Sequence, residues 1–356
     1  MKPFFVTLIL IFSFFFNSFG QTAKETAHEK GKQAIKLEDE GKFDEALKLL
    51  DEAQKLDPDN IIYPYEMTYC YYSQEQYQKA IDVLEKLKDR PDSFDRLYEL
   101  LGNSYDILKQ SDKAIAIYEE GLKKFPNSGV LYLERGTLPL TAKNYNEAIK
   151  YFEKGIEVEP KFPSNYYWAA KLYCASENPV WGIIYGEIFM NLERNSKRTG
   201  EISKVLFDTY KRSITFPSSG KMAISFSKQN TMTTDDVKTV KLPYGMVYEL
   251  SISLAAAGEN NINLNSLDRI RQKFLKYYDE KGSNKKYPNV LFDYQDQITQ
   301  AQTMEAYNHW LLMKGDEAEF NTWQAANKDK WDAFVKWYMA NPLQLDAEHR
   351  FHKNMY

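Results

Sequence analysis

The sequence is poor in several features that would point to a particular class of protein. It has two cysteines, Cys70 and Cys174, in 356 residues, which are too few for a disulfide scaffold or for zinc sites built from paired Cys-x-x-Cys motifs. It also has no excess of positive charge, because 46 Lys and Arg stand against 50 Asp and Glu and give a net charge of −4. Nucleic-acid binding draws on clustered cations, so we expect no nucleic-acid partner.

Motifs of catalysis are missing as well, since the chain has neither a phosphate-binding glycine loop nor a nucleophile elbow. His349 and His352 could share a helix face as metal ligands, but with no further His or Cys nearby we expect a solvated tail. Glu305 and His309, four residues apart, could form an acid–base pair, although a surface ion pair is the simpler interpretation. We therefore predict a protein that is not an enzyme, with no catalytic residues, no cofactor and no metal.

The long hydrophobic run of the chain is at its N-terminus. Residues 4–16 are almost continuously apolar, Lys2 precedes them, and the small residues Ser18 and Gly20 follow. This pattern predicts a secretory signal peptide over residues 1–20, cleaved after Gly20. An uncleaved anchor is the alternative, but the run is shorter than the ~20 residues of a spanning helix. We expect a periplasmic or secreted protein without membrane insertion after cleavage and, because no cysteine follows Gly20, without a lipid anchor.

What the sequence has in abundance is aromatic side chains, and it also has an internal repeat. Aromatic residues make up 15% of the chain, mostly 26 Tyr and 21 Phe, a content that suits packed helix pairs and binding surfaces equally well. A period of 34 residues runs through the first half without insertions. The units start at Ala27, Ile61, Asp95, Gly129 and Pro163.

Within each unit, small residues recur where two helices would cross, and large residues lie about one turn away, because a large side chain at a crossing would force the backbones apart. The third unit shows this pattern best, with Tyr98, Leu101, Gly102, Tyr105, Ala114, Tyr118, Gly121 and Pro126. The pattern resembles the tetratricopeptide repeat. The resemblance implies antiparallel helix pairs stacked into an α-solenoid of about four and a half repeats, which we expect over residues 21–196.

Two departures from the pattern lead to specific expectations. Pro139 stands inside the first helix of the fourth unit, and because an interior proline breaks helices we expect that helix to be short. The fifth unit has no closing proline, so we interpret it as a degenerate transition into the next domain.

Cys70 and Cys174 fall on first helices three repeats apart, much farther than the ~5.5 to 6 Å between the Cα atoms of a disulfide, and we expect both to be free thiols.

The resemblance also implies that the first helix of each pair lines a concave groove. The groove residues that we predict to bind a partner are Tyr65, Tyr69, Tyr72, Arg96, Asn103, Leu133, Tyr167 and Trp168. A clamp for a peptide carboxylate is not expected, because only Asn103, with Arg96 nearby, matches the family members that have one. The remaining aromatic and aliphatic patch suits a protein or peptide segment. The alternative is that these tyrosines pack against the C-terminal domain, folded into the groove.

The C-terminal half, residues 197–356, resembles no family that we recognise. Alternating residues over 214–216 and 222–227 predict a short strand pair, and helical periodicity predicts helices over 245–257, 266–280, 290–314 and 317–340. An aromatic stripe with helical spacing is interpreted as core rather than binding surface. Its members are Phe320, Trp323, Trp331, Phe334 and Tyr338. The fold class is therefore mostly α, an α-solenoid followed by a helical C-terminal domain with a short β-hairpin.

Taken together, these features predict a non-catalytic scaffold or adaptor of the cell envelope that binds a protein or peptide segment in the concave groove. Two alternatives stay open. One is an enzyme of unknown type in residues 197–356, which would require a cleft with perturbed titratable groups. The other is a glycan-binding protein, because aromatic-rich exported repeat proteins of the SusD family bind glycans. The sequence does not determine the oligomeric state.

Overall fold

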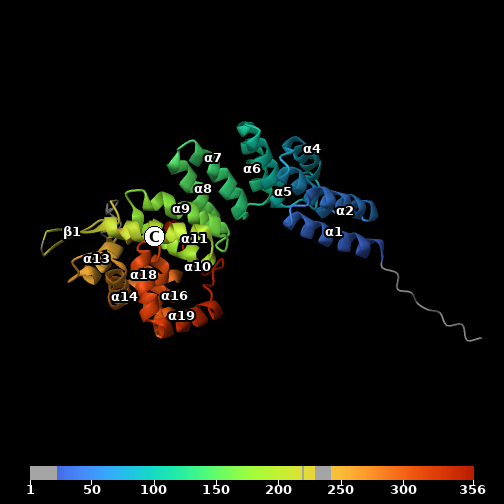
Figure 1. Ribbon diagram of the computed structural model, residues 1–356. Coiled ribbons are helices and arrows are strands. Elements are labelled where there is room, and N and C mark those ends of the chain that lie inside the picture. Colours follow the sequence, from blue (N-terminus) through green and yellow to red (C-terminus); the bar gives the residue numbers. More distant parts are fainter. Residues whose placement is uncertain (1–21, 219, 229–241) are drawn as a thin grey trace, which may run out of the picture. The chain divides into compact units, whose positions relative to one another are not determined.

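The computed structural model describes residues 22–218, 220–228 and 242–356 (Figure 1). The predicted signal peptide lies outside the described residues. The chain divides into two compact units, Met1–Ser93 and Phe94–Tyr356, and each is described here by itself. In the described ranges, no helix combines the length and the apolar character needed to cross a membrane.

The first unit consists of two helix pairs. Its helices are α1 (Ala23–Asp39), α2 (Phe43–Leu56), α3 (Ile62–Ser73) and α4 (Tyr77–Leu87). Thr22 and Glu25 form a capping box that satisfies free amides at the start of α1. Ala34 and Ala46 are fully buried where α1 meets α2, which is the small-residue crossing that the repeat predicts.

The second unit begins with three more helix pairs and a single helix. These are α5 (Asp95–Ile107), α6 (Ser111–Lys124), α7 (Gly129–Thr141), α8 (Tyr145–Val158), α9 (Pro163–Cys174), α10 (Pro179–Leu192) and α11 (Lys197–Ser213). Gly102 shows why a small residue is required: a Cβ atom there would lie 2.2 Å from the ring of Tyr118. The fifth sequence unit, although degenerate, still forms the pair α9 and α10, and α11 packs against both of them.

The turn within each of the first four helix pairs has the same backbone conformation. A residue with positive φ occurs at intervals of 34, at Gly41, Glu75, Lys109 and Lys143. Its N–H donates to the carbonyl three residues earlier, and the following N–H donates to the carbonyl five residues earlier, as from Lys109 to Asp106 and from Gln110 to Tyr105. This is the left-handed helix end that glycine favours. Only in the first repeat does a glycine, Gly41, mark this position in the sequence.

The expectation of a short first helix in the fourth repeat is wrong. α7 contains Pro139 and still has 13 residues, the same length as α5. Pro139 lies in the last turn of α7. Because proline has no backbone N–H, the helix loses a single hydrogen bond there. The carbonyl of Pro139 is used to close the turn, because it accepts from the N–H of Asn144 at 2.8 Å.

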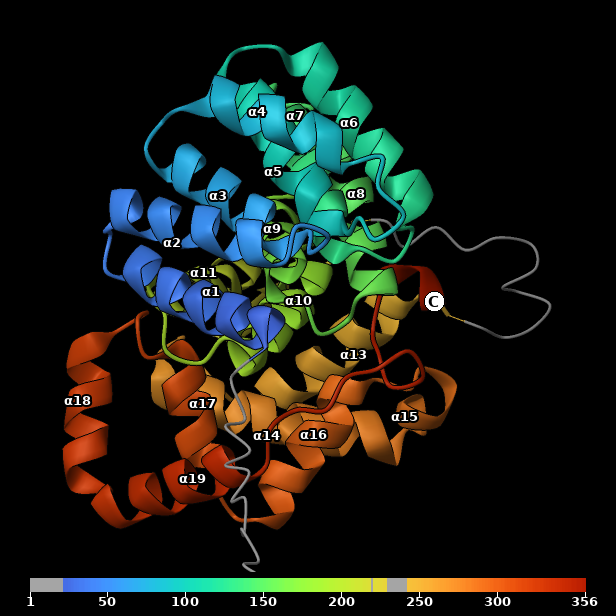
Figure 2. The same ribbon diagram turned by 90° about the vertical axis from the view of Figure 1, so that its right-hand side faces the viewer.

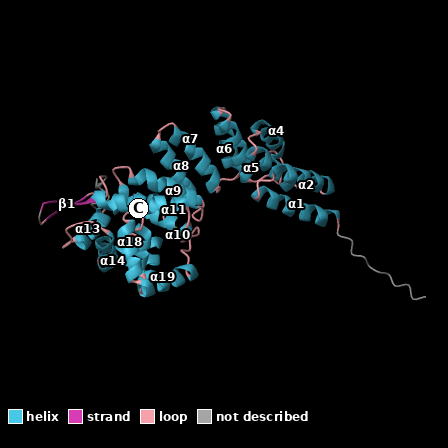
Figure 3. Ribbon diagram, viewed as in Figure 1, coloured by secondary structure: helices cyan, strands magenta, loops and turns pink. Residues whose placement is uncertain are grey.

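The C-terminal half contains the predicted hairpin and a set of short helices (Figure 3). Strands β1 (Ile214–Ser218) and β2 (Lys221–Ile224) pair antiparallel, with Ile214 opposite Ile224. The helices are α13 (Tyr244–Ala256), α14 (Leu264–Glu280), α15 (Ser283–Lys286), α16 (Val290–Gln300), α17 (Met304–Leu312), α18 (Glu317–Ala326), α19 (Lys328–Ala340) and the 3-10 turn η1 (Lys353–Met355). Helices α14, α16 and α17 pack against one another, and α19 contacts α17 (Figure 2). The predicted fold class is confirmed.

Two long helices predicted in this half are each divided in two. The segment 290–314 breaks at Gln302, whose φ is 59° and whose N–H donates to the carbonyl of Thr299. The segment 317–340 breaks at Asn327, whose N–H and side-chain amide both donate to the carbonyl of Trp323. Neither break has the glycine or proline that would have marked it in the sequence.

A buried ion pair joins the last repeat pair to the C-terminal helices. Arg271 on α14 lies 2.6 Å from Glu187 on α10, and the two side chains are 6% and 2% exposed. Tyr307 and Gln295 also donate hydrogen bonds to the Glu187 carboxylate, and Arg271 donates to Asn308. Removing one partner of such a buried ion pair leaves the other charge uncompensated, which lowers the stability of the fold. The pair therefore holds α10 and α14 together.

The C-terminal tail is packed rather than solvated, contrary to expectation. Phe351 is fully buried, with ring centroids 6.2 Å from Trp181 and 6.0 Å from Tyr185. Arg350 donates to the carbonyl of Glu157 at 2.6 Å. The neighbouring His349 is held by Asp346 instead of by a metal site. The tail thus ties the end of the chain to helices α8 and α10.

Candidate protein-binding surface

The first unit presents its first helices, α1 and α3, side by side. Gly31 of α1 lies under the Tyr63 ring, where an added Cβ would come within 2.9 Å. Seven residues further along both helices, the Cys70 thiol donates to the Glu38 carboxylate at 3.3 Å. The two helices therefore run in register, and side chains on their common side form one surface.

Apolar side chains are exposed on this side of the first unit. Ile35 of α1 is 42% exposed, and Ile62 and Tyr69 of α3 are 40% and 45% exposed. Ile62, Glu66 and Tyr69 share one face of α3, because residues four and seven apart align on a helix. We call the set Ile35, Glu38, Ile62, Glu66 and Tyr69 the α1–α3 surface. Such a patch of large apolar residues is typical of an interaction site.

Two carboxylates belong to the α1–α3 surface, and both have raised pKa values. Burial raises the pKa of Glu38 to about 7, with smaller contributions from the charges of Glu66 and Asp39, against the hydrogen bond from Cys70. Burial also raises the pKa of Glu66. Over residues 22–218, 220–228 and 242–356, neither carboxylate forms an ion pair with a Lys, Arg or His. The surface therefore combines apolar side chains with two carboxyl groups that have no cation beside them in the described part of the chain.

The other two predicted residues of the first unit contribute less to a surface. Tyr65 and Tyr72 are half-buried. The Tyr72 ring packs edge-on against Tyr77 of α4, with centroids 5.3 Å apart. Tyr72 therefore stabilises its own helix pair, and Tyr69 is the most exposed of the three predicted tyrosines.

In the second unit, the predicted polar groove residues already have partners within the chain. Arg96 is exposed and pairs with Glu99 on the next turn of α5 at 2.8 Å. The Asn103 side-chain oxygen accepts a hydrogen bond from the Tyr118 hydroxyl at 2.5 Å. Asn103 therefore links α5 to α6.

Of the predicted aromatic groove residues of the second unit, Tyr167 is covered by α11. Tyr167 is only 6% exposed, and its hydroxyl donates to Glu201 of α11 at 2.5 Å. Lys171 pairs with the same Glu201 and lies 5.0 Å from the ring centroids of Tyr167 and Trp168. Trp168 and Leu133 are half-buried and pack against the core of this unit. The alternative that the C-terminal half fills the groove thus holds for Tyr167, since α11 belongs to residues 197–356.

The first helices of the second unit carry one further unusual carboxyl group. The pKa of Glu134 on α7 is raised to about 7, mainly by burial and also by the charge of Glu99, against the charge of Arg96. Glu134 lies on the helix that also carries Leu133. The charge on this side of α5 and α7 is thus balanced in part by an arginine of the same chain.

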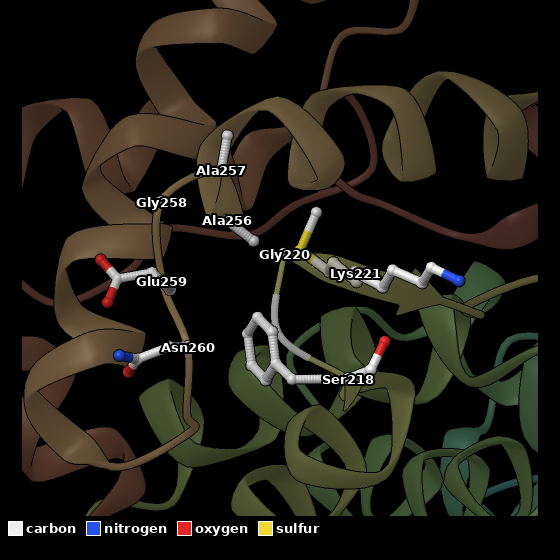
Figure 4. Close-up of a pocket in the computed structure, with 10 residues that line it drawn as sticks. Ser218, Gly220, Lys221, Ala256, Ala257, Gly258, Glu259 and Asn260 are labelled. Carbon is white, nitrogen blue, oxygen red and sulfur yellow. The ribbon is translucent and has the colours of Figure 1, made fainter.

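An open cavity of about 600 Å³ lies between the β-hairpin and the end of α13 (Figure 4). Phe216 and Met222 supply its apolar lining, and its charged side chains are Lys221 and Glu259. Glu259 is bound by Arg269 at 2.6 Å, which lowers the pKa of its carboxyl. A carboxyl group with a lowered pKa is a poor general acid near neutral pH. The cavity provides space for a small ligand beside an apolar lining.

Both earlier interpretations of Glu305 and His309 are wrong. His309 is 1% exposed and stacks on Trp323, with ring centroids 4.1 Å apart. Its Nδ1 contacts the backbone carbonyl of Glu305, while the Glu305 carboxylate accepts from Trp323 and pairs with Lys330. The two side chains are thus neither an acid–base pair nor a surface ion pair. Among the described residues, no three His, Cys, Asp or Glu side chains are grouped as a metal site would require.

Family comparison supports the repeat assignment. Models of the tetratricopeptide repeat match residues 37–104, 95–127 and 131–162, which lie on α1 to α8. The chain is a tetratricopeptide-repeat protein. The family supports a protein–protein interaction scaffold in general, and its helix-pair fold is a non-catalytic one. The matches end at residue 162, before the C-terminal half of this tetratricopeptide-repeat protein.

Several solved structures are similar to part of the chain. The tetratricopeptide-repeat protein TTC0263 of Thermus thermophilus is 16% identical, with 51% of this chain and 98% of that chain covered and a TM-score of 0.43. PilF of Pseudomonas aeruginosa is 16% identical, with 53% and 85% covered and a TM-score of 0.45. MamA is 20% identical, with 48% and 92% covered and a TM-score of 0.37. Since the TM-scores are all below one half, the assignment rests on the family models and on the helix pairs themselves.

Two features of the surface were missed in the sequence. α11 starts 34 residues after α9, so it continues the repeat in space although its residues do not follow the pattern. Neither Glu38, which the repeat places on the concave face, nor Glu66 was predicted as a binding residue, because a carboxylate in a charged helix resembles any solvated residue. Their signal was their position beside Ile62 and Tyr69 on first helices, which could have been found from the 34-residue register.

Proposed function

We propose that this protein is a non-catalytic adaptor of the cell envelope that binds a protein or peptide segment on the first helices of its repeats. The observation that carries the proposal is the exposure of Ile35, Ile62 and Tyr69 on the α1–α3 surface. Apolar side chains of this size stabilise a folded protein when buried and contribute little when left in water. Their exposure on two adjacent first helices supports binding at this site.

The test is a pair of variants that remove apolar contact without removing the fold. Ile62→Ala with Tyr69→Ala truncates two exposed side chains of α3, and we expect capture of the native partner to fall at least about tenfold. Tyr145→Ala is the matched control, because Tyr145 is 50% exposed on the second helix α8. Partner capture is measured by pull-down from the native cells, and the melting temperature is measured in parallel.

The double variant and the control separate the possible results. The proposal predicts loss of capture for the double variant only, with melting temperatures close to that of the parent protein. Equal capture by the parent protein and the double variant would reject binding at the α1–α3 surface. Capture lost equally in Tyr145→Ala would show that the assay does not report on this surface.

The envelope location is the second part of the proposal and rests on residues 1–20. Export predicts that the mature protein starts at Gln21 and is released with the periplasmic or extracellular fraction. Mass spectrometry of the N-terminal peptide, after cell fractionation, checks this directly. A chain that retains Met1 and stays with the cytoplasmic fraction would contradict it.

A further inference from the structure

The α1–α3 surface also contains information about the chemistry of its partner. We infer that the bound segment is apolar and carries a lysine or arginine, whose cation lies against Glu66 with Glu38 behind it. The inference rests on the proposed function, because it describes what binds at the same surface. It commits to a cationic protein segment rather than to a purely apolar one.

The first step is the position of the two carboxylates. Glu66 is half-buried on α3, one turn after Ile62 and just before Tyr69. Glu38 is 8% exposed at the end of α1, close enough for the charge of Glu66 to raise its pKa. A side chain that lies between Ile62 and Tyr69 would therefore meet Glu66 first. The apolar contacts and the negative charge belong to one binding site.

The second step is that neither carboxyl group has a cation partner among the described residues. The Glu38 carboxylate accepts a bond from the Cys70 thiol, a weak donor, and burial dominates the raised pKa of both carboxyl groups. In the described part of the chain, no ion pair reaches either of them. A partly buried carboxylate is stabilised when an opposite charge is brought within ~4 to 6 Å. A cation on the partner would supply it.

The third step is a comparison with carboxylates on the first helices of the second unit. Glu99 pairs with Arg96, and Glu201 pairs with Lys171 beside the Trp168 ring. Glu134 on α7 has no ion pair among the described residues, but the charge of Arg96 still lowers its pKa. The causes of the raised pKa values of Glu38 and Glu66 include no such cation. At Glu66 and Glu38, the complementary charge is left to the partner. Charge complementarity of this kind sets specificity and orientation at an interface.

The test uses the purified full-length chain and a displayed library of random 12-residue peptides. Selected peptides are expected to contain Lys or Arg next to large apolar residues. Replacing that cation by Gln in a synthetic peptide, or replacing Glu66→Gln in the protein, should each weaken binding about tenfold. Glu45→Gln, an exposed carboxylate on α2, is the matched control and should leave binding unchanged.

Each outcome decides a different point. Peptides whose binding is lost in the Ile62→Ala, Tyr69→Ala variant and weakened by Glu66→Gln support the inference. Peptides whose binding is lost in the Ile62→Ala, Tyr69→Ala variant but unchanged by Glu66→Gln overturn the inference. The proposed function would still stand. If no selected peptide depends on Ile62 and Tyr69, the proposed function fails and the inference fails with it. A circular dichroism spectrum of Glu66→Gln that matches the parent spectrum ensures that a lost charge, not a lost fold, is measured.

Discussion

The two compact units use the same repeat in different ways. In the first unit, Tyr69 on a first helix is 45% exposed and the neighbouring carboxylates have no cation in the described part of the chain. In the second unit, Tyr167 on a first helix is 6% exposed and donates to Glu201 of α11. Both tyrosines lie on first helices of the same 34-residue repeat. Within the second unit, α11 packs over Tyr167, whereas Tyr69 keeps almost half of its surface exposed.

Under the proposed function, this difference separates the residues for binding from the residues for stability. Side chains that pack inside the second unit contribute to its folding, together with the buried Arg271–Glu187 pair. The exposed apolar side chains of the α1–α3 surface, Ile35, Ile62 and Tyr69, are expected to contribute little to folding. The predictions below test this contrast, beginning with the variant expected to have the largest effect.

The buried ion pair should dominate the stability of the second unit. Arg271→Met removes the cation and leaves Glu187 buried without it, so we expect a loss of about 3 to 5 kcal/mol in the free energy of unfolding. Arg269→Met is the control, because Arg269 is 52% exposed in its pair with Glu259 and should cost less than about 1 kcal/mol. Urea denaturation followed by tryptophan fluorescence measures both. Equal losses would contradict the structural role of the buried pair.

The two tyrosines should respond differently to truncation. Tyr167→Ala removes a buried ring and a hydrogen bond to Glu201, and should lower the free energy of unfolding by about 3 kcal/mol. Tyr69→Ala removes an exposed ring and should cost less than about 0.5 kcal/mol. Denaturation curves of the two variants provide the comparison. A larger loss for Tyr69→Ala would mean that the first unit depends on this residue for folding.

The raised pKa of Glu38 predicts a pH dependence of the first unit. The pKa rises from 4.5 to about 7 on folding, so the folded state binds more protons between these values and stability falls as pH rises through that window. We expect a fall of about 1 to 2 kcal/mol between pH 5 and pH 8 from this group. Glu38→Gln should remove most of that fall. A variant whose stability profile over this range superimposes on that of the parent would refute the assignment.

The repeated turn predicts the smallest effect. Lys109 has φ of 62° where the first repeat has Gly41 with φ of 75°. Lys109→Gly should therefore stabilise the second unit by about 0.5 to 1 kcal/mol, and Gly41→Ala should destabilise the first by a similar amount. Thermal unfolding of the two variants checks the opposite signs. Two shifts of the same sign would contradict a shared left-handed turn.

Much of the repeat could be predicted from the sequence because small residues and prolines mark it directly. The units expected at Asp95, Gly129 and Pro163 begin at those residues as α5, α7 and α9. The breaks at Gln302 and Asn327 were missed because neither turn contains the glycine or proline that marks most helix ends. The two cysteines are free and buried, as expected.

The candidate site was predicted only in part. Tyr69 is exposed as a groove residue should be, but the exposure of Tyr167 depends on α11, whose sequence does not follow the repeat. The packed tail shows the same limit, because Phe351 is buried by residues that are far away in the sequence. Local patterns predict which helix carries a side chain. Contacts between distant segments decide whether that side chain stays at the surface.

Site-specific photo-crosslinking in the native cells tests the central contrast most directly. A photoreactive phenylalanine analogue is placed at Tyr69 in one variant and at Tyr167 in another, so that an aromatic ring is kept at both positions. Our account predicts a crosslink to a second protein from position 69 and only crosslinks within the chain from position 167. A partner crosslinked from position 167 and not from position 69 would contradict it.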